Sequence, residues 1–419
     1  MTLNYIWVGF FVVGFIVAIV RTILGYYGLG TDADKIVFET IGVGTFASAK
    51  AAFMNVALPL CGVITLWMGL MRVGEKAGAV NFLSRLIGPF FRHLFPGIPQ
   101  GHPAQGQIML NFSSNMLGLS NAATPMGLKA MASMQELNED KETASNSMIM
   151  FLALNTAGLT LIPVTILGLR NAAVSANPTD VFVPILIASF CATMVAVLFT
   201  AIRQRILTAQ LASWLLGGIA IMSGIIWGFL QMSPSTRAAV SSIGGNFILL
   251  AIIVSFLLVA AFKKINVFSE FIEGAKEGFS TMVRIVPYLV AMIVAIGVFR
   301  NCGAMDYITQ GLTSLFTWIG TDTQFVPAIP VALMKPLSGG GTEGLVVSLM
   351  DPKTGFGPDS FVGRLASIMY ASADTTFYIV ALYFGSIGIK RTRYAIGAGL
   401  IADLAGILAA IFVCYLFFG

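Results

Sequence analysis

Charged residues are scarce in this chain. They account for 10% of its 419 residues, whereas soluble domains carry about 25%. Such a chain cannot cover its surface against water, so lipid must cover it. Apolar runs of about 20 residues are long enough to cross a bilayer as helix. We predict an all-α polytopic membrane protein with spanning segments at 5–24, 53–71, 147–167, 181–201, 211–230, 247–262, 282–299, 365–383 and 394–417.

Histidine and cysteine are also rare, and their spacing excludes several chemistries. The two histidines show no HExxH-type spacing and the four cysteines form no CxxC motif. The glycines at 339–341 are not followed by the GK[ST] of a phosphate-binding loop. We therefore expect no enzyme, no catalytic residues, no metal site and no cofactor. The formal net charge of +5 is assigned to basic loops at the membrane surface, not to nucleic-acid binding.

Helix breakers and polar residues recur when the second part of the chain is slid along the first. The coinciding pairs are Pro59 with Pro287, Gly69 with Gly297, Arg72 with Arg300, Pro99 with Pro327, Ser114 with Thr342, Asn115 with Glu343, Asn155 with Asp374 and Thr156 with Thr375. This pattern predicts two repeats. The expected parts are an N-terminal helix and outer loop (1–46), a first repeat (47–205), two connecting helices (206–265) and a second repeat (266–419).

The basic residues predict the orientation of each part. Lys and Arg crowd 72–92, 203–205, 263–264 and 390–393, and such loops stay in the cytoplasm. The N-terminus is then cytoplasmic. The amphipathic stretch 79–95 lies on the inner face, and its basic-free counterpart 304–320 lies on the outer face. The two repeats are therefore predicted to be inverted, each with a re-entrant helical hairpin, at 105–134 and 325–350.

Polar residues at membrane depth mark the candidate site. Inverted repeats with interrupted helices point to solute and ion sites near the midplane, and an acid at that depth usually has a function. Glu343 and Asp374 are the candidate carriers of a coupling Na⁺ or H⁺; the alternative for Glu343 is a structural ion pair with Lys335. The full set of candidate binding residues is Asn111, Ser113, Ser114, Asn115, Asn155, Thr156, Ser338, Gly340, Gly341, Thr342, Glu343, Ser372, Asp374 and Thr375.

Long motifs in both repeats resemble known families. "NFSSNMLGLSNAATPMGLKAM" and "LNTAGLTLIPVTILGLR" resemble spore maturation protein A, and "KPLSGGGTEG" and "SADTTFYIVALYFGSIGIKR" resemble spore maturation protein B. The chain thus resembles a fusion of the two, within the nucleoside-recognition or gate-domain group. That group is distantly similar to concentrative nucleoside transporters and to the gate segments of ferrous-iron transporter B. The resemblance implies ligand contact for Thr342 and Glu343, although Gly341 stands where the nucleoside carriers have Gln.

These observations together predict a transporter in a bacterial inner membrane. It would move a small polar solute, coupled to Na⁺ or H⁺, by alternating access around the paired hairpin tips. One alternative is a channel or lipid-handling protein, and another is a membrane scaffold linked to envelope or spore maturation. A homo-oligomer is compatible with this reading, although no dimer seam is visible in the sequence.

Overall fold

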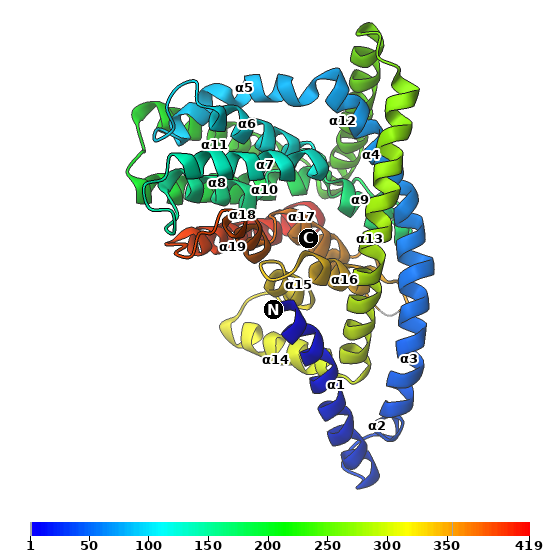
Figure 1. The fold of residues 1–419 in the computed structure, drawn as a ribbon. Coiled ribbons are helices and arrows are strands. Elements are labelled where there is room, and N and C mark those ends of the chain that lie inside the picture. The colour runs from blue at the N-terminus through cyan, green and yellow to red at the C-terminus, as the bar shows by residue number, and fades with distance from the viewer. Residues whose placement is uncertain (1, 354) are drawn as a thin grey trace.

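The fold was examined in a computed structural model that describes residues 2–353 and 355–419. Within these residues helix is the regular secondary structure, apart from one isolated β-bridge between Thr143 and Arg391. Figure 1 shows the order of the helices along the chain. The first ten elements are α1 (Thr2–Tyr26), α2 (Asp32–Lys35), α3 (Val37–Ala51), η1 (Ala52–Ala57), α4 (Leu58–Ala77), α5 (Ala79–Leu94), α6 (Pro103–Met116), α7 (Ser120–Glu136), α8 (Asn146–Ala157) and α9 (Val164–Ala172).

The second part of the chain is equally helical. Its elements are α10 (Phe182–Gln204), α11 (Ala209–Leu230), α12 (Pro234–Phe262), α13 (Val267–Asn301), α14 (Ala304–Ile319), η2 (Val326–Ala328), α15 (Ile329–Met334), α16 (Gly339–Met350), α17 (Phe361–Ala371), α18 (Thr376–Ser386) and α19 (Ala395–Phe418).

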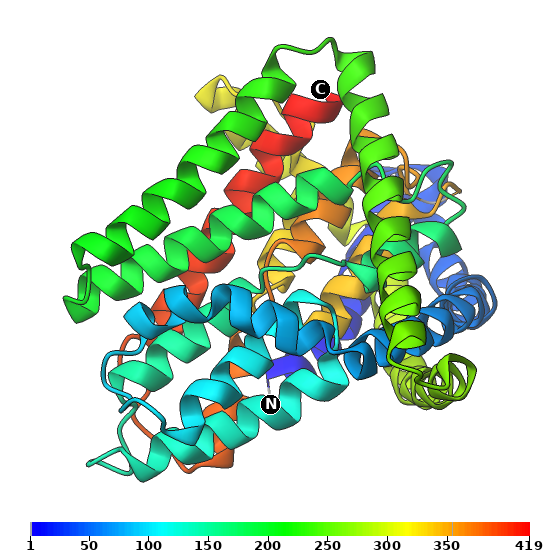
Figure 2. The same ribbon diagram turned by 90° about the horizontal axis from the view of Figure 1, so that it is seen from above.

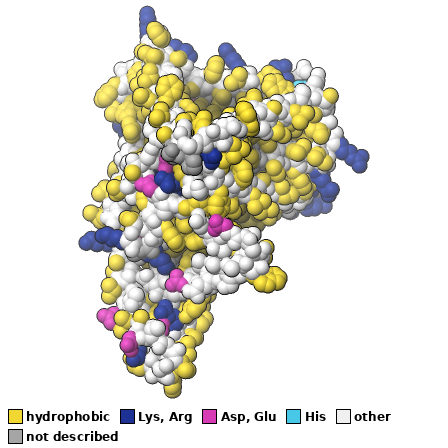
Figure 3. Space-filling view, turned by 180° about the vertical axis from the view of Figure 1, so that it is seen from behind, with side chains coloured by type: hydrophobic (Ala, Val, Ile, Leu, Met, Phe, Trp, Pro, Cys, Tyr) yellow, Lys and Arg dark blue, Asp and Glu magenta, His cyan; other side chains and the backbone are white. Residues whose placement is uncertain are grey.

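Eight helical segments in the described residues are long and apolar enough to cross a membrane. They are Tyr5–Tyr26, Val37–Ala77, Phe182–Gln204, Ala209–Leu230, Ala239–Phe262, Val267–Asn301, Phe361–Ser386 and Ala395–Phe418. Their outer faces carry many exposed large apolar side chains, such as Phe15, Leu216 and Phe247. Figure 3 shows hydrophobic side chains widely spread over one face, most densely in its upper and right-hand parts, with Lys and Arg mainly at its edges and a few within it. The protein is a multi-pass membrane protein, as the sequence predicted.

Two predicted spans are longer in the structure than the sequence suggested. The segment expected at 53–71 belongs to one helical run of 41 residues, Val37–Ala77. A π-helical turn, η1, interrupts the α-geometry just before Pro59, whose missing N–H and bulky ring disturb the preceding turn. The segment expected at 282–299 is part of the 35-residue α13, which is about 52 Å long at 1.5 Å per residue.

Helices α4 and α13 pack closely side by side (Figure 1 and Figure 2). Glycines make the approach possible. A Cβ atom added at Gly274 would lie 2.5 Å from the Cβ of Arg72 and 2.5 Å from the carbonyl oxygen of Met68. At the same junction Arg72 bonds Glu270 and Glu277, at 3.2 and 2.9 Å. In lipid, where the hydrophobic effect does not drive helices together, close packing at small residues stabilises their association. We call the pair of α4 and α13, which runs along one side of the molecule, the column.

The remaining helices form a second body beside that column. Figure 2 shows α10, α11 and α19 running alongside one another, and α8, α17 and α18 pack against them. The buried side chains concentrate here: all of α8 from Met148 to Ala157 is inaccessible to solvent or nearly so. The two stretches for which re-entrant hairpins were predicted contain α6 and α7, and α15 and α16, and the helices of each pair pack against each other. The stretches expected at 79–95 and 304–320 form α5 and α14.

Candidate functional site

Two predicted spans are interrupted in the structure, which corrects the expectation of continuous helices at 147–167 and 365–383. The first divides into α8 and α9 around residues 158–163, and the second into α17 and α18 around residues 372–375. Gly158 ends α8 at a φ of 56°, a left-handed conformation that glycine adopts without steric cost. Pro163 is the N-cap residue directly before α9. Irregular backbone at membrane depth is tolerated where protein or a water-filled cavity satisfies its polar groups.

The two interruptions touch each other. The backbone N–H of Asp374 donates a hydrogen bond of 2.7 Å to the carbonyl oxygen of Thr156. The two broken helices run in opposite directions, because the start of each lies beside the end of the other. Ala144, just before α8, donates to the carbonyl of Arg391 after α18, at 3.0 Å, while Arg170 in α9 bonds Pro358 before α17.

A cavity of about 260 Å³ opens where the interruptions meet. Its walls come from the tips and breaks of both repeats. The lining residues are Asn115, Gly118, Asn155, Gly158, Thr160, Ile162, Pro163, Val164, Thr165, Ile166, Lys335, Tyr370, Ala371, Ala373 and Asp374. Three of the predicted binding residues, Asn115, Asn155 and Asp374, therefore lie together on this cavity, and the other predicted residues are not among those that line it.

Hydrogen bonds between side-chain amides fix the positions of Asn115 and Asn155 on the cavity wall. The Nδ2 of Asn115 donates to the Oδ1 of Asn155 at 2.9 Å, and the Nδ2 of Asn155 donates to the carbonyl of Phe151 at 2.9 Å. The Tyr383 hydroxyl accepts from Asn111 at 3.2 Å and donates to Asn155 at 3.5 Å. Asn111 is therefore a buried supporting residue, whereas Asn115 and Asn155 present polar atoms to the cavity.

Ser338 is the N-cap residue of α16 and makes the hydrogen bonds that hold the turn before this helix. Its hydroxyl accepts from the N–H of Gly341 at 3.0 Å, and its carbonyl accepts from the Thr342 hydroxyl at 2.6 Å. Thr342 is fully buried and Glu343 is 7% exposed; neither lines the cavity. A Cβ atom on Gly341 would lie 3.1 Å from Met292 of α13. Of the predicted glycines, Gly340 alone has open space beside its Cα, with no heavy atom described within 4 Å.

The other predicted residues make local contacts. Ser113 shares a 3.0 Å hydrogen bond with Ser84 of α5, and the Ser114 carbonyl accepts from Leu119 at 2.8 Å. The Ser372 hydroxyl donates to the carbonyl of Met369 at 3.0 Å. The N–H of Thr375 donates to Asp374 Oδ1 at 2.7 Å, and Thr156 contributes the carbonyl that joins the two breaks.

Lys335 is a cavity residue that the sequence analysis treated only as a partner of Glu343. It lies between α15 and α16 with 5% of its surface exposed, and its ammonium lies 4.6 Å from the centre of the Tyr370 ring. In the part of the chain that the structure describes, no carboxylate lies within 4.0 Å of it, so the expected pair with Glu343 is not formed. The sequence signal was a lysine inside an otherwise apolar segment.

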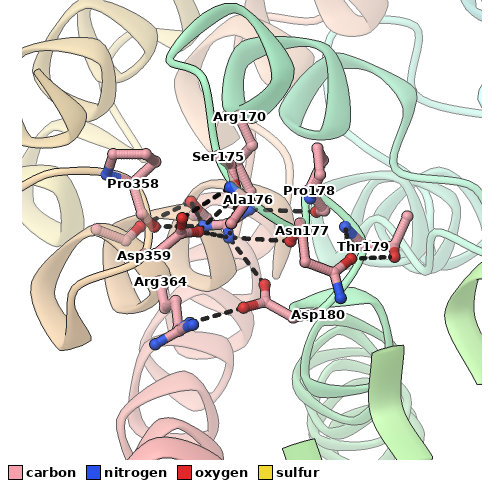
Figure 4. A network of polar contacts seen from close by, with 12 residues as sticks. Arg170, Ser175, Ala176, Asn177, Pro178, Thr179, Asp180, Pro358, Asp359 and Arg364 are labelled. Atoms are coloured by element: carbon pink, nitrogen blue, oxygen red, sulfur yellow. Dashed lines mark hydrogen bonds and ion pairs between the residues drawn. The ribbon is translucent and has the colours of Figure 1, made fainter. Parts of the chain in front are cut away.

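A second polar cluster ties the two repeats together at one end of the broken helices (Figure 4). Arg170 is fully buried and bonds Asp180 at 2.8 Å and Asp359 at 3.1 Å. Arg364 bonds the other oxygen of Asp180 at 2.7 Å. Burial opposes ionisation of Asp359, but hydrogen bonds from Ser175 and Ala176 and the charge of Arg170 lower the pKa of that carboxyl. Sequence reasoning did not single out this cluster.

Residues 2–353 and 355–419 contain no group of three or more His, Cys, Asp or Glu side chains arranged for a metal ion. The cavity instead offers one ammonium, one carboxylate, two amides and the free ends of two broken helices. Such a set has the polar and charged groups that binding of a small polar solute requires.

The fold and this cavity define a membrane protein of the gate type, in which interrupted helices meet inside the membrane-spanning body. Sequence comparison agrees. The profile of the nucleoside-recognition (gate) family matches residues 57–173 and 282–390, and the chain belongs to that family.

Two curated relatives cover different parts of the chain. Spore maturation protein B of Bacillus subtilis (strain 168) is 45% identical over 168 residues, which are 40% of this chain and 91% of that protein. Spore maturation protein A of the same organism is 39% identical over 195 residues, which are 46% of this chain and 92% of that protein. The two matches are consistent with a chain that is a fusion of two such proteins.

Proposed function

We propose that the protein is a secondary transporter that moves a small polar solute across a bacterial inner membrane by alternating access. The observation that carries this proposal is the cavity between two oppositely directed, interrupted helices, with Lys335 and Asp374 on its walls. Charged residues and broken helices are costly inside a membrane and are typical of solute pathways. Na⁺ or H⁺ remains the proposed coupling ion, with Glu343 and Asp374 as its candidate carriers.

The arrangement of the loops supports the proposed orientation, with the N-terminus in the cytoplasm. Basic residues at 390–393 contact residues 140–146, and Gln204 donates to the carbonyl of Asn146 at 2.8 Å, so three loops assigned to the inner face lie together. At the assigned outer face, Arg21 bonds Asp34 at 2.5 Å and the carbonyl of Cys302 at 3.0 Å. The opposite directions of the two broken helices support the proposed inverted repeat.

The unit that moves is proposed to contain parts of both repeats. Hydrogen bonds at the breaks and the Arg170 cluster join α8–α10 to α17–α19 at several points. Motion of one whole repeat against the other would rupture these contacts. We propose instead that the broken helices and hairpins move together against the column of α4 and α13.

A cysteine-accessibility experiment tests the transport pathway. Thr160, on the cavity wall, is replaced by Cys in a background in which Cys61, Cys191, Cys302 and Cys414 are replaced by Ser. A membrane-impermeant maleimide is then applied separately to each side of oriented vesicles. We expect labelling from both sides. Leu216→Cys, on the lipid-facing surface of α11, is the matched control and should resist the reagent. A cavity cysteine that is unreactive from both sides would favour the scaffold.

A counterflow assay separates a carrier from a channel. Proteoliposomes are preloaded with one unlabelled solute class at a time, chosen among amino acids, nucleosides, sugars and carboxylates, and the labelled tracer is added outside. A carrier exchanges the two and shows a transient accumulation of tracer. A pore or a lipid-handling protein shows no such overshoot for any class, and this outcome would reject the proposed function.

A further inference from the structure

The walls of the cavity carry two opposite charges that are not paired with each other. Lys335 is 95% buried, as its 5% exposure implies, and lines the cavity without a hydrogen bond or ion pair to any described residue. Asp374 is exposed and lines the same cavity, and among the described residues its Oδ1 accepts a hydrogen bond from its neighbour Thr375 alone. A buried charge without a partner is expensive. For Lys335 the Tyr370 ring offsets part of that cost, and an anionic group of a ligand would offset more of it. Asp374, which is exposed to the cavity, would gain an ion pair with a cationic group.

The beginning of α9 adds positive character to one wall. Val164, Thr165 and Ile166 form the first turn of this nine-residue helix and all three line the cavity. The residue before them, Pro163, provides no side-chain cap. The first N–H groups of a helix have no partner within it, and they attract anions. The N–H of Val164 already bonds the carbonyl of Ile162 at 2.9 Å, which leaves those of Thr165 and Ile166, for which the described residues provide no partner. The wall near Lys335 and the wall at α9 therefore both favour a negatively charged group.

Other elements that line the cavity have negative character. Helix α17 ends at Ala371, and α8 ends at Ala157 just before Gly158. The last carbonyl groups of a helix lack partners and favour cations. Asp374 follows the end of α17 directly. The cavity thus offers groups suited to a carboxylate and groups suited to an ammonium.

We propose that the solute is a small zwitterion of the amino-acid type. Its carboxylate lies toward Lys335 and the first turn of α9, and its ammonium lies toward Asp374. The size agrees with this class, because about 260 Å³ is below the roughly 300–1,000 Å³ of pockets for drug-sized ligands. The inference rests on the proposed function for its biological meaning, but binding can be measured without transport.

The test compares probes that differ by one charge. Thermal unfolding and isothermal titration of the purified protein are measured with glycine, L-alanine and L-serine. The matched probes are lactate and propionate, which lack the ammonium, alaninamide, which lacks the carboxylate, and uridine. We expect saturable binding and a raised melting temperature for at least one amino acid, and at least tenfold weaker binding of its single-charge analogues. Lactate or propionate binding as tightly as L-alanine, or uridine binding alone, would overturn the proposal.

Variants locate the binding to the cavity. Lys335→Met is expected to weaken amino-acid binding at least tenfold, and Asp374→Asn should abolish the preference for L-alanine over lactate. Lys353→Met, which removes an exposed lysine outside the cavity, should leave the affinity unchanged. Unchanged affinity in both cavity variants would contradict the assignment. The probe series with wild-type protein decides the question even if a cavity variant fails to fold.

The two proposals can fail separately. If Thr160→Cys is labelled from both sides and another solute class shows counterflow while amino acids do not bind, the transporter stands and the zwitterion is rejected. If amino acids bind but the cysteine is unreactive and no class shows counterflow, the site stands as a binding site and transport is rejected.

Discussion

The N–H of Asp374 is hydrogen-bonded to the carbonyl of Thr156 across 2.7 Å, so the two interrupted helices are joined at their breaks by backbone alone. A backbone bond between the two breaks does not depend on either side chain. Asp374 is therefore fixed in position while its carboxylate stays available to the cavity. Asn115 and Asn155 line the same cavity as Lys335 and Asp374.

Replacing Gly158 tests this junction. Gly158→Ala places a Cβ 3.1 Å from the Asp374 nitrogen at a positive φ of 56°. The left-handed conformation costs a non-glycine residue roughly 1–2 kcal/mol, and the contact adds to that cost. We expect a lowered melting temperature in detergent. Gly385→Ala in α18, where no described heavy atom lies within 4 Å of the added Cβ, is the control. Equal stability of the two variants would contradict this account.

The Arg170 cluster predicts a large loss of stability. Arg170→Met leaves Asp180 and Asp359 without their shared cation, and breaking a buried pair costs about 3–5 kcal/mol. The exposed Arg391–Asp140 pair, 65% and 54% accessible, provides the matched control. Arg391→Gln should cost no more than about 1 kcal/mol. Chemical unfolding of both variants measures the difference, and a similar effect of the two would show that burial does not govern the cluster.

We expect the stability of the protein to depend on pH through Asp34 of α2, the short helix before α3. Hydrogen bonds from the Thr31 backbone and hydroxyl, and from Arg21, lower the pKa of Asp34 from 3.8 to about 2. Because the folded state binds this proton less readily than the unfolded state, the contribution of Asp34 is complete above about pH 4 and disappears as the pH falls toward 2. The stability difference between wild type and Asp34→Asn should therefore narrow over that interval. Asp32→Asn, at an exposed pair, should show a much smaller difference at every pH.

The α4–α13 column predicts that glycine position matters along α4 and α13. Gly274→Ala forces a Cβ against Arg72 and Met68, and overpacking typically costs about 1–3 kcal/mol. Gly62→Ala places its Cβ where the described structure has no heavy atom within 4 Å and should be nearly neutral. Thermal unfolding of the two variants is the measurement. A neutral Gly274→Ala would mean that the helices can separate without cost.

Apolar run length and amphipathic period predicted most of the helices, because lipid exposure leaves a direct record in sequence. The interruptions of two spans were missed. Gly158 and Pro163 were visible, but the run around them is so apolar that length dominated the interpretation. The sequence analysis also missed that the span predicted at 53–71 begins at residue 37. Here the reason was the opposite one, because the charged residues Glu39 and Lys50 made a helical segment resemble a loop.

The candidate site was predicted only in part, for a different physical reason. Asn115, Asn155 and Asp374 were found because polar groups in an apolar run stand out. Lys335 was assigned to Glu343 because the two are close in sequence, whereas the fold turns its ammonium toward Tyr370. The contacts of Arg170 with Pro358 and Asp359 join residues far apart in the chain, and no local pattern carries that information.

The division of the cavity between the two repeats has a consequence for how the protein is made. Asn115 and Asn155 belong to one repeat and Lys335 and Asp374 to the other, so neither half contains a complete binding site. Synthesis as one polypeptide fixes equal amounts of both halves and turns their meeting into an intramolecular event, with an effective concentration in the millimolar range for short flexible links. Two separate chains of this design would have to find each other within the bilayer, and their assembly would depend on how much of each the cell produces.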